Sequence, residues 1–218
     1  MRKYLMMLCL VLGLNASAVK VSVDENVEFV SAMCRLAGFK EYVNNVNKQY
    51  VTTLDSVMAP LKGCPAVMRL NELRDAQGLS YDAVAALAAH TAIRDGRFVL
   101  LPGSDLSKLD SRWKSGQDAE VARLLDEAYR QSRFHDFYIS QKPFYDKVMI
   151  NVESMLANVD FAWLEDFYGS EILGRLSVSL LNSGNYGVTC KRLGMPDESV
   201  FIIGCWKLDE NGIPVFHD

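Results

Sequence analysis

Apolar residues recur with helical spacing from residue 24 onward. Val27, Val30 and Cys34 form one stripe, Asp24 is a residue type typical of a helix N-cap, and Gly38 suits the position just after a helix end. The same reasoning predicts further helices at Lys48–Met58, at 65–78 and at 132–139. It also predicts one helix that Ser80 caps, one that begins near Gln117, one that Ser140 caps, and one at Phe161–Tyr168 that Asp160 caps. A short strand at 98–101 follows the Asp95-Gly96 turn. Residues 24–169 are therefore expected to be mainly helical.

The hydrophobic period changes after Gly174. Leu176, Val178 and Leu180 alternate with serines, which predicts a half-buried strand. Turn-forming clusters separate further apolar segments, so we expect strands at 176–180, 186–193, 199–208 and 213–216. Short turns between consecutive strands indicate an antiparallel meander over residues 174–216. The predicted fold class is α+β, with a helical part packed on this small sheet in a single domain of residues 19–218.

One cysteine pair has a geometric case for a disulfide. If the hairpin after residue 193 is symmetric about Asp197 and Glu198, Cys190 and Cys205 lie opposite each other, within disulfide reach. A shift of one residue in the strand pairing would remove the contact, and free cysteines are common in protein cores. The two alternatives stay open at this stage.

The N-terminus is typical of a secretory signal peptide. Arg2 and Lys3 precede an apolar stretch of about a dozen residues, and Ala16-Ser17-Ala18 supplies the small residues of a cleavage site. We therefore expect cleavage after Ala18 and a secreted or periplasmic location. An uncleaved N-terminal anchor is the alternative, although the stretch is shorter than the roughly 20 residues of a membrane span.

Composition limits the function classes. The chain has 218 residues, of which 50% are hydrophobic and 23% charged, as in an ordinary globular protein. Its formal charge of −4 argues against a generally basic nucleic-acid binder. No second long apolar run follows the N-terminus, so we expect no integral membrane span after signal cleavage and no nucleic-acid partner.

The sequence contains no recognisable catalytic or metal-binding motif. His90, His135 and His217 form no His-x-x-x-His pair, and there is no Cys-x-x-Cys, no Gly-x-Ser-x-Gly elbow and no phosphate-binding loop. His90 suits the end of its predicted helix, and His135 is expected to be a packed, hydrogen-bonded histidine more readily than a catalytic base. The aromatic runs 134–138 and 161–168 are interpreted as core, with a carbohydrate platform as the minority interpretation. We therefore assign no catalytic or metal-ligating residue and no cofactor to this chain.

Several segments resemble a domain-of-unknown-function family of secreted proteins from anaerobic gut bacteria. The resemblance covers nearly all of residues 19–218 and is carried by the segments VEFVS at 27–31, CRLAGF at 34–39, LSYDAV at 79–84, FHDFY at 134–138, VDFAW at 159–163, FYG at 167–169, LLN at 180–182, NYGV at 185–188 and GCWKL at 204–208.

The resemblance implies a metallopeptidase architecture. Longer members look like zincins, in which a His-Glu-x-x-His helix follows the sheet, binds zinc and supplies the general base, while a peptide substrate lies along a strand edge. This chain stops at Asp218, before any such motif, so no zinc ligand or general base carries over, and zinc is expected only in a longer form. We expect an inactive front portion of such an enzyme. The alternatives are an extracytoplasmic peptide- or glycan-binding module without catalysis, and a scaffold for a missing half.

Overall fold

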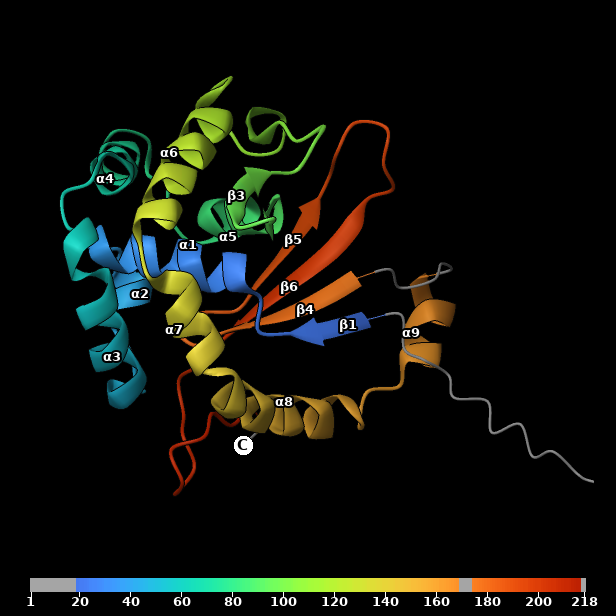
Figure 1. Cartoon of the computed structure of the whole chain (residues 1–218). Helices are drawn as coiled ribbons and strands as arrows, with labels where there is room; N and C mark the ends of the chain where they lie inside the picture. Colours follow the sequence, from blue (N-terminus) through green and yellow to red (C-terminus); the bar gives the residue numbers. More distant parts are fainter. Residues whose placement is uncertain (1–18, 169–173, 217–218) are drawn as a thin grey trace, which may run out of the picture.

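The computed structural model describes residues 19–168 and 174–216 and confirms the α+β class (Figure 1). Its elements are β1 (Val19–Ser22), α1 (Glu25–Leu36), α2 (Lys40–Val43), α3 (Lys48–Met58), the 3₁₀ turn η1 (Ala59–Leu61), α4 (Pro65–Gln77), α5 (Asp82–Ala89), β2 (Thr91–Arg94), β3 (Arg97–Leu100), the 3₁₀ turn η2 (Leu106–Lys108), α6 (Gln117–Gln131), α7 (Phe134–Ser140), α8 (Lys142–Leu156), α9 (Phe161–Tyr168), β4 (Gly174–Ser179), β5 (Tyr186–Cys190) and β6 (Glu198–Gly204). The predicted signal peptide, residues 1–18, lies outside the described residues. Within them, no helix is long and apolar enough to cross a membrane.

Most helix boundaries agree with the sequence prediction, but two predicted caps are wrong. α3 has the predicted bounds, and Asp160 accepts a hydrogen bond from the Trp163 N–H at 2.9 Å at the start of α9. Ser80 does not cap α5, because Tyr81 takes that position and donates its N–H to the Glu41 carboxylate at 2.8 Å. Ser140 does not cap α8, since its hydroxyl donates to the Phe137 carbonyl within α7.

The main sheet is mixed, so the predicted antiparallel meander is wrong. The strand order is β1-β4-β6-β5, with β1, β4 and β6 parallel and β5 antiparallel to β6. β6 therefore lies between β4 and β5, which follow each other in the chain. The connection between those two strands crosses the end of β6, where Cys205 N–H donates to the Asn182 carbonyl at 2.9 Å. Gly204 permits this crossing, because a Cβ there would lie 2.5 Å from the Asn182 oxygen.

The fourth strand of the sheet comes from the N-terminal side of the domain. Residues 213–216 form no strand and contribute only the isolated bridge between Leu208 and Pro214. β1 takes the edge position beside β4, with Val19 opposite Gly174. A strand of four residues whose partner lies about 150 residues away leaves no local signal in the sequence.

The structure also contradicts the proposed pairing of Cys190 with Cys205. The β5–β6 hairpin turns around Gly194, where Met195 N–H donates to the Arg192 carbonyl, so Cys190 lies opposite Glu198. Cys205 follows the end of β6 and lies outside this register. Both thiols are free and buried.

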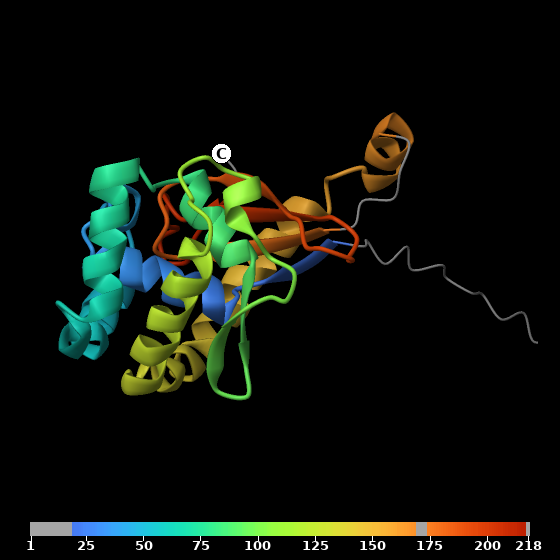
Figure 2. The same cartoon turned by 90° about the horizontal axis from the view of Figure 1, so that it is seen from above.

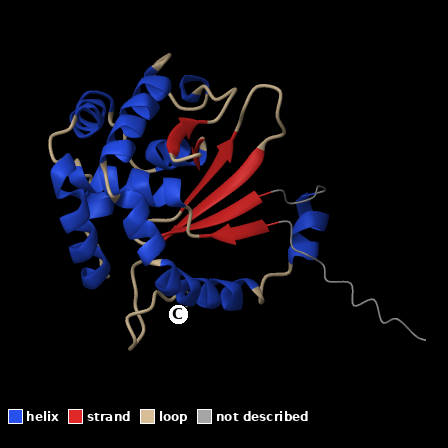
Figure 3. Cartoon of the chain, viewed as in Figure 1, coloured by secondary structure: helices blue, strands red, loops and turns tan. Residues whose placement is uncertain are grey.

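The helices pack mainly around α1. α1 contacts β4 and α5 contacts β5, while α8 lies beside β1 (Figures 1 and 3). Phe29 of α1 is fully buried and its ring contacts those of Phe98, Tyr129 and Phe134, at centroid distances of 5.6, 5.1 and 5.1 Å. Seen from above, α3 and α4 lie at one end of the molecule and α9 at the other (Figure 2).

Candidate functional site

His90 has a structural position at the end of α5. It is fully buried, and its ring bonds to the Ala86 carbonyl through Nδ1 at 2.8 Å, in agreement with the predicted capping role. Its Nε2 accepts the Lys191 N–H at 3.0 Å, so Nδ1 carries the proton of the neutral ring. His90 therefore ties the end of α5 to the start of the β5–β6 hairpin loop.

His135 forms a surface cluster with Glu25 and Tyr129. Its Nδ1 lies 2.9 Å from the Glu25 carboxylate, which also accepts the Tyr129 hydroxyl at 2.6 Å. The His135 side chain is 58% exposed, so it is hydrogen-bonded but not packed as the sequence predicted. Within the described chain, no serine or cysteine side chain hydrogen-bonds to it.

Glu28 is the centre of a buried polar network that sequence reasoning missed. It is fully buried on α1 and accepts the Leu180 N–H and the Tyr50 hydroxyl, both at 2.7 Å, and Tyr50 is 2.8 Å from the Tyr145 hydroxyl. Burial raises the pKa of Glu28 to about 7 against the effect of these donors. The network joins α1, α3 and α8 to the end of β4, and Glu28 itself is out of reach of a ligand in solution.

A groove runs beside β5 and the loop that follows it. It consists of two hollows that share Leu109, Lys191 and Asp197. The loop hollow, of about 640 Å³, lies between residues 103–109, which follow β3, and residues 191–197 of the β5–β6 hairpin. The strand hollow, of about 380 Å³, lies between β5 at residues 187–189, α5 and the 109–110 segment.

The two loops around the loop hollow are held together by main-chain contacts. Leu193 N–H donates to the Gly103 carbonyl at 2.9 Å. Gly103 has φ +83°, and a Cβ there would lie 2.9 Å from both the nitrogen and the oxygen of Leu193, so only glycine fits. Together with the His90–Lys191 bond, this contact fixes the start of the hairpin loop segment that lines the hollow.

Two polar groups of the loop hollow have no hydrogen-bond partner. They are the buried Nε of Arg192 and the buried hydroxyl of Ser104. Among the described residues, the other half-buried arginines each pair with a carboxylate, namely Arg35, Arg69, Arg74, Arg112 and Arg175. Arg192 forms no such pair. Its positive charge and a side-chain hydrogen bond to Cys190 oppose the burial that raises the pKa of the Cys190 thiol. A buried donor without an acceptor is costly and is a reason to look for a ligand or water there.

Part of the rim of the loop hollow is apolar. Leu193 is 90% exposed, Met195 50% and Leu109 40%. Large aliphatic side chains gathered around a hollow are typical of a binding surface, whereas scattered ones need no explanation.

The strand hollow exposes main-chain groups of β5. Lys191 directs its N–H and its carbonyl toward His90, with the carbonyl 3.2 Å from Nε2. In an antiparallel strand alternate residues point their main-chain groups to the same side, so Thr189 and Gly187 direct theirs toward the hollow. Asp82 and Asp110, which both pair with Arg112, also line it.

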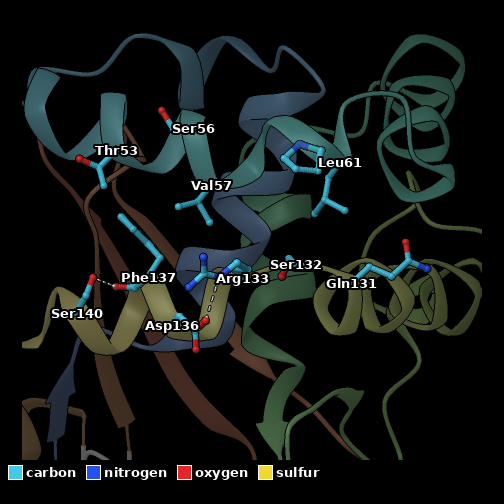
Figure 4. A pocket seen from close by; sticks show the side chains of 11 residues that line it. Thr53, Ser56, Val57, Leu61, Gln131, Ser132, Arg133, Asp136, Phe137 and Ser140 are labelled. Carbon is cyan, nitrogen blue, oxygen red and sulfur yellow. Dashed lines mark hydrogen bonds and ion pairs between the residues drawn. The ribbon is translucent and has the colours of Figure 1, made fainter.

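In another hollow of the molecule, the hydroxyl and guanidinium donors already have acceptors. Figure 4 shows a hollow of about 470 Å³ between α3 and α7. Arg133 pairs there with Asp136, and the hydroxyls of Thr53, Ser56, Ser132 and Ser140 each donate to a nearby main-chain carbonyl. Its hydroxyl and guanidinium donors are already engaged, in contrast to Arg192 and Ser104.

The sequence assigned the groove residues to a helix, a strand and turns without bringing them together, because their proximity depends on tertiary contacts. Residues 19–168 and 174–216 contain no group of three or more His, Cys, Asp or Glu side chains that could hold a metal ion. No family model, curated protein or solved structure matches the chain.

Proposed function

We propose that this protein is an exported, non-catalytic module that binds peptides in the groove beside β5. The observation that carries the proposal is a pair of adjoining hollows. One contains the unpartnered Arg192 Nε and Ser104 hydroxyl, and the other is lined by residues 187–189 of the edge strand β5. Export rests on the predicted signal peptide. The resemblance to the front portion of a zincin-like metallopeptidase stays a prediction, and peptide binding is compatible with it.

The groove suits an extended peptide in size and chemistry. Each hollow falls in the range of about 300–1,000 Å³ typical of ligand sites. Main-chain groups of Gly187 and Thr189 offer strand-like hydrogen bonds to a peptide, and side-chain pockets next to such an edge supply specificity. The contact of α5 with β5 limits this pairing to a short stretch.

Peptide arrays test this function. Octapeptides made as free acids and as amides are screened against the protein, and the strongest binder is titrated by calorimetry. Met195→Ala is expected to weaken that binding about tenfold, because burial of such a side chain contributes about 1.5 kcal/mol. Met68 on α4, 52% exposed and outside the groove, supplies the matched control Met68→Ala, which is expected to bind normally. Absence of binding in both series, or equal effects of the two variants, would contradict the proposal.

A glycan-binding function is the second candidate, and α9 is the observation that favours it. Trp163 and Phe167 are 58% and 67% exposed, and their rings stack at 5.3 Å with an interplanar angle of 19°. Exposed stacked aromatic rings offer a flat apolar surface of the kind on which sugar rings pack. Oligosaccharide arrays test it: binding that Trp163→Ala abolishes, and that the control Trp206→Ala retains, would support this candidate. Trp206 is 48% exposed and lies after β6.

A further inference from the structure

The charges of the side chains that line the groove differ between its two hollows. The loop hollow is lined by three cationic side chains, Lys108, Lys191 and Arg192, and by two carboxylates, Asp105 and Asp197. The strand hollow is lined by three carboxylates and by the single cation Lys191. Of the carboxylates, Asp82 and Asp110 also pair with Arg112. A peptide with its negative end in the loop hollow therefore matches the charges better than the opposite direction.

The cations of the loop hollow differ in how far they are already neutralised. Lys108 lies 3.0 Å from Asp105, which also accepts the Ser107 hydroxyl at 2.6 Å. Lys191 faces Asp197 at 3.7 Å. Arg192 has no carboxylate partner, its Nε has no acceptor, and the hydroxyl of Ser104 is equally unpartnered in the same hollow. The charge that a ligand can use is therefore that of Arg192.

A carboxylate is the ligand group whose chemistry matches a guanidinium and a hydroxyl in one hollow. Its two oxygens accept from a guanidinium in the bidentate arrangement and can also accept a hydroxyl proton. The apolar rim formed by Leu109, Leu193 and Met195 surrounds the same hollow and can pack an aliphatic side chain next to that carboxylate. A free peptide carboxyl end carries both features in its last residue.

We propose that the loop hollow is a recognition site for the free C-terminal carboxylate of a peptide whose last side chain is aliphatic. Arg192 and Ser104 bind the carboxylate, the rim of Leu109, Leu193 and Met195 packs the last side chain, and the preceding residues lie parallel to β5 in the strand hollow. This inference rests on the proposed peptide-binding function and specifies its substrate class.

The test compares one octapeptide ending in leucine, chosen as the strongest array binder, in free-acid and amide form. The free acid is expected to bind about tenfold to hundredfold more tightly, since hydrogen bonds to charged groups contribute about 1.5–3 kcal/mol. Arg192→Gln is expected to reduce the acid-to-amide ratio to about one, and Arg192→Lys to restore part of it. Arg94→Gln is the matched control, because Arg94 is an exposed arginine of β2 outside the groove. Urea unfolding of each variant reports whether it is folded.

The outcomes separate this inference from the function on which it rests. Equal binding of acid and amide, or an acid preference that survives Arg192→Gln, overturns carboxyl-end recognition and leaves peptide binding standing. Failure of both forms to bind refutes both proposals. Two further arms distinguish other sources of the anion: equally tight binding of the amide with glutamate at the last position, or displacement of the peptide by millimolar inorganic phosphate, also overturns recognition of the terminus.

Discussion

Replacement of Glu28 by glutamine tests the interpretation of the buried network. Glutamine keeps the shape of the side chain and can accept the Leu180 N–H through its oxygen. Its amide can donate to the Tyr50 hydroxyl, which then donates to Tyr145, so the variant reproduces the bonding of a protonated Glu28. The variant therefore differs from the wild type mainly in having no proton to lose.

The magnitude and its direction follow from the pKa of Glu28, which burial raises from 4.5 to about 7 in the folded protein. Below the unfolded value near 4.5 both states are protonated and the raised pKa has its full stabilising effect. As the pH rises through 7, the folded protein must carry a buried charge, and that stability is lost. At about 1.4 kcal/mol for each pKa unit, the wild type should lose about 3 kcal/mol relative to Glu28→Gln between pH 4.5 and 8.

Urea unfolding curves for both proteins at constant ionic strength between pH 4.5 and 8 measure this difference. Subtraction of the two free energies of unfolding at each pH cancels the contributions of the other titrating groups. Glu153→Gln, which replaces an exposed carboxylate of α8, reports the effect of the substitution at the surface. A difference between wild type and Glu28→Gln that stays constant with pH would refute the assignment of a titrating buried carboxyl.

Two further substitutions test the groove and the core. Gly103→Ala places a Cβ against the Leu193 backbone in a left-handed conformation, so we expect a loss of about 1–2 kcal/mol in urea unfolding and weaker peptide binding in calorimetry; unchanged peptide affinity would show that the spacing of the two loops does not determine the groove. Asp126→Asn removes a buried carboxylate that accepts from two arginines and from the Phe98 N–H, which hold its pKa below 3.8. We expect a loss of about 1–3 kcal/mol at pH 7 that disappears as the pH falls below about 4, and a loss that is equal at both pH values would contradict the ion pair.

The candidate groove shows where local pattern fails as a guide to function. The sequence placed the hairpin turn at Asp197 and Glu198, whereas it lies around Gly194, and nothing in the sequence brings it to the loop at Gly103. Their meeting depends on the Leu193–Gly103 contact and on His90, which are separated from their partners by about 90 to 100 residues. Glu28 carried a weak signal, because it interrupts an apolar helix segment, but its partners at Leu180 and Tyr145 could not be inferred.

The sequence by itself determined the class of the fold and most helix boundaries, because helical periodicity, prolines and caps act over a few residues, as at Lys48–Met58 and at Asp160. Only the tertiary structure decided the strand order, the position of β1 and the register that separates Cys190 from Cys205. Strand pairing joins residues far apart in the chain, and its outcome depends on which segments can cross one another. Here the crossing requires a glycine at position 204, because a side chain there would collide with the Asn182 carbonyl.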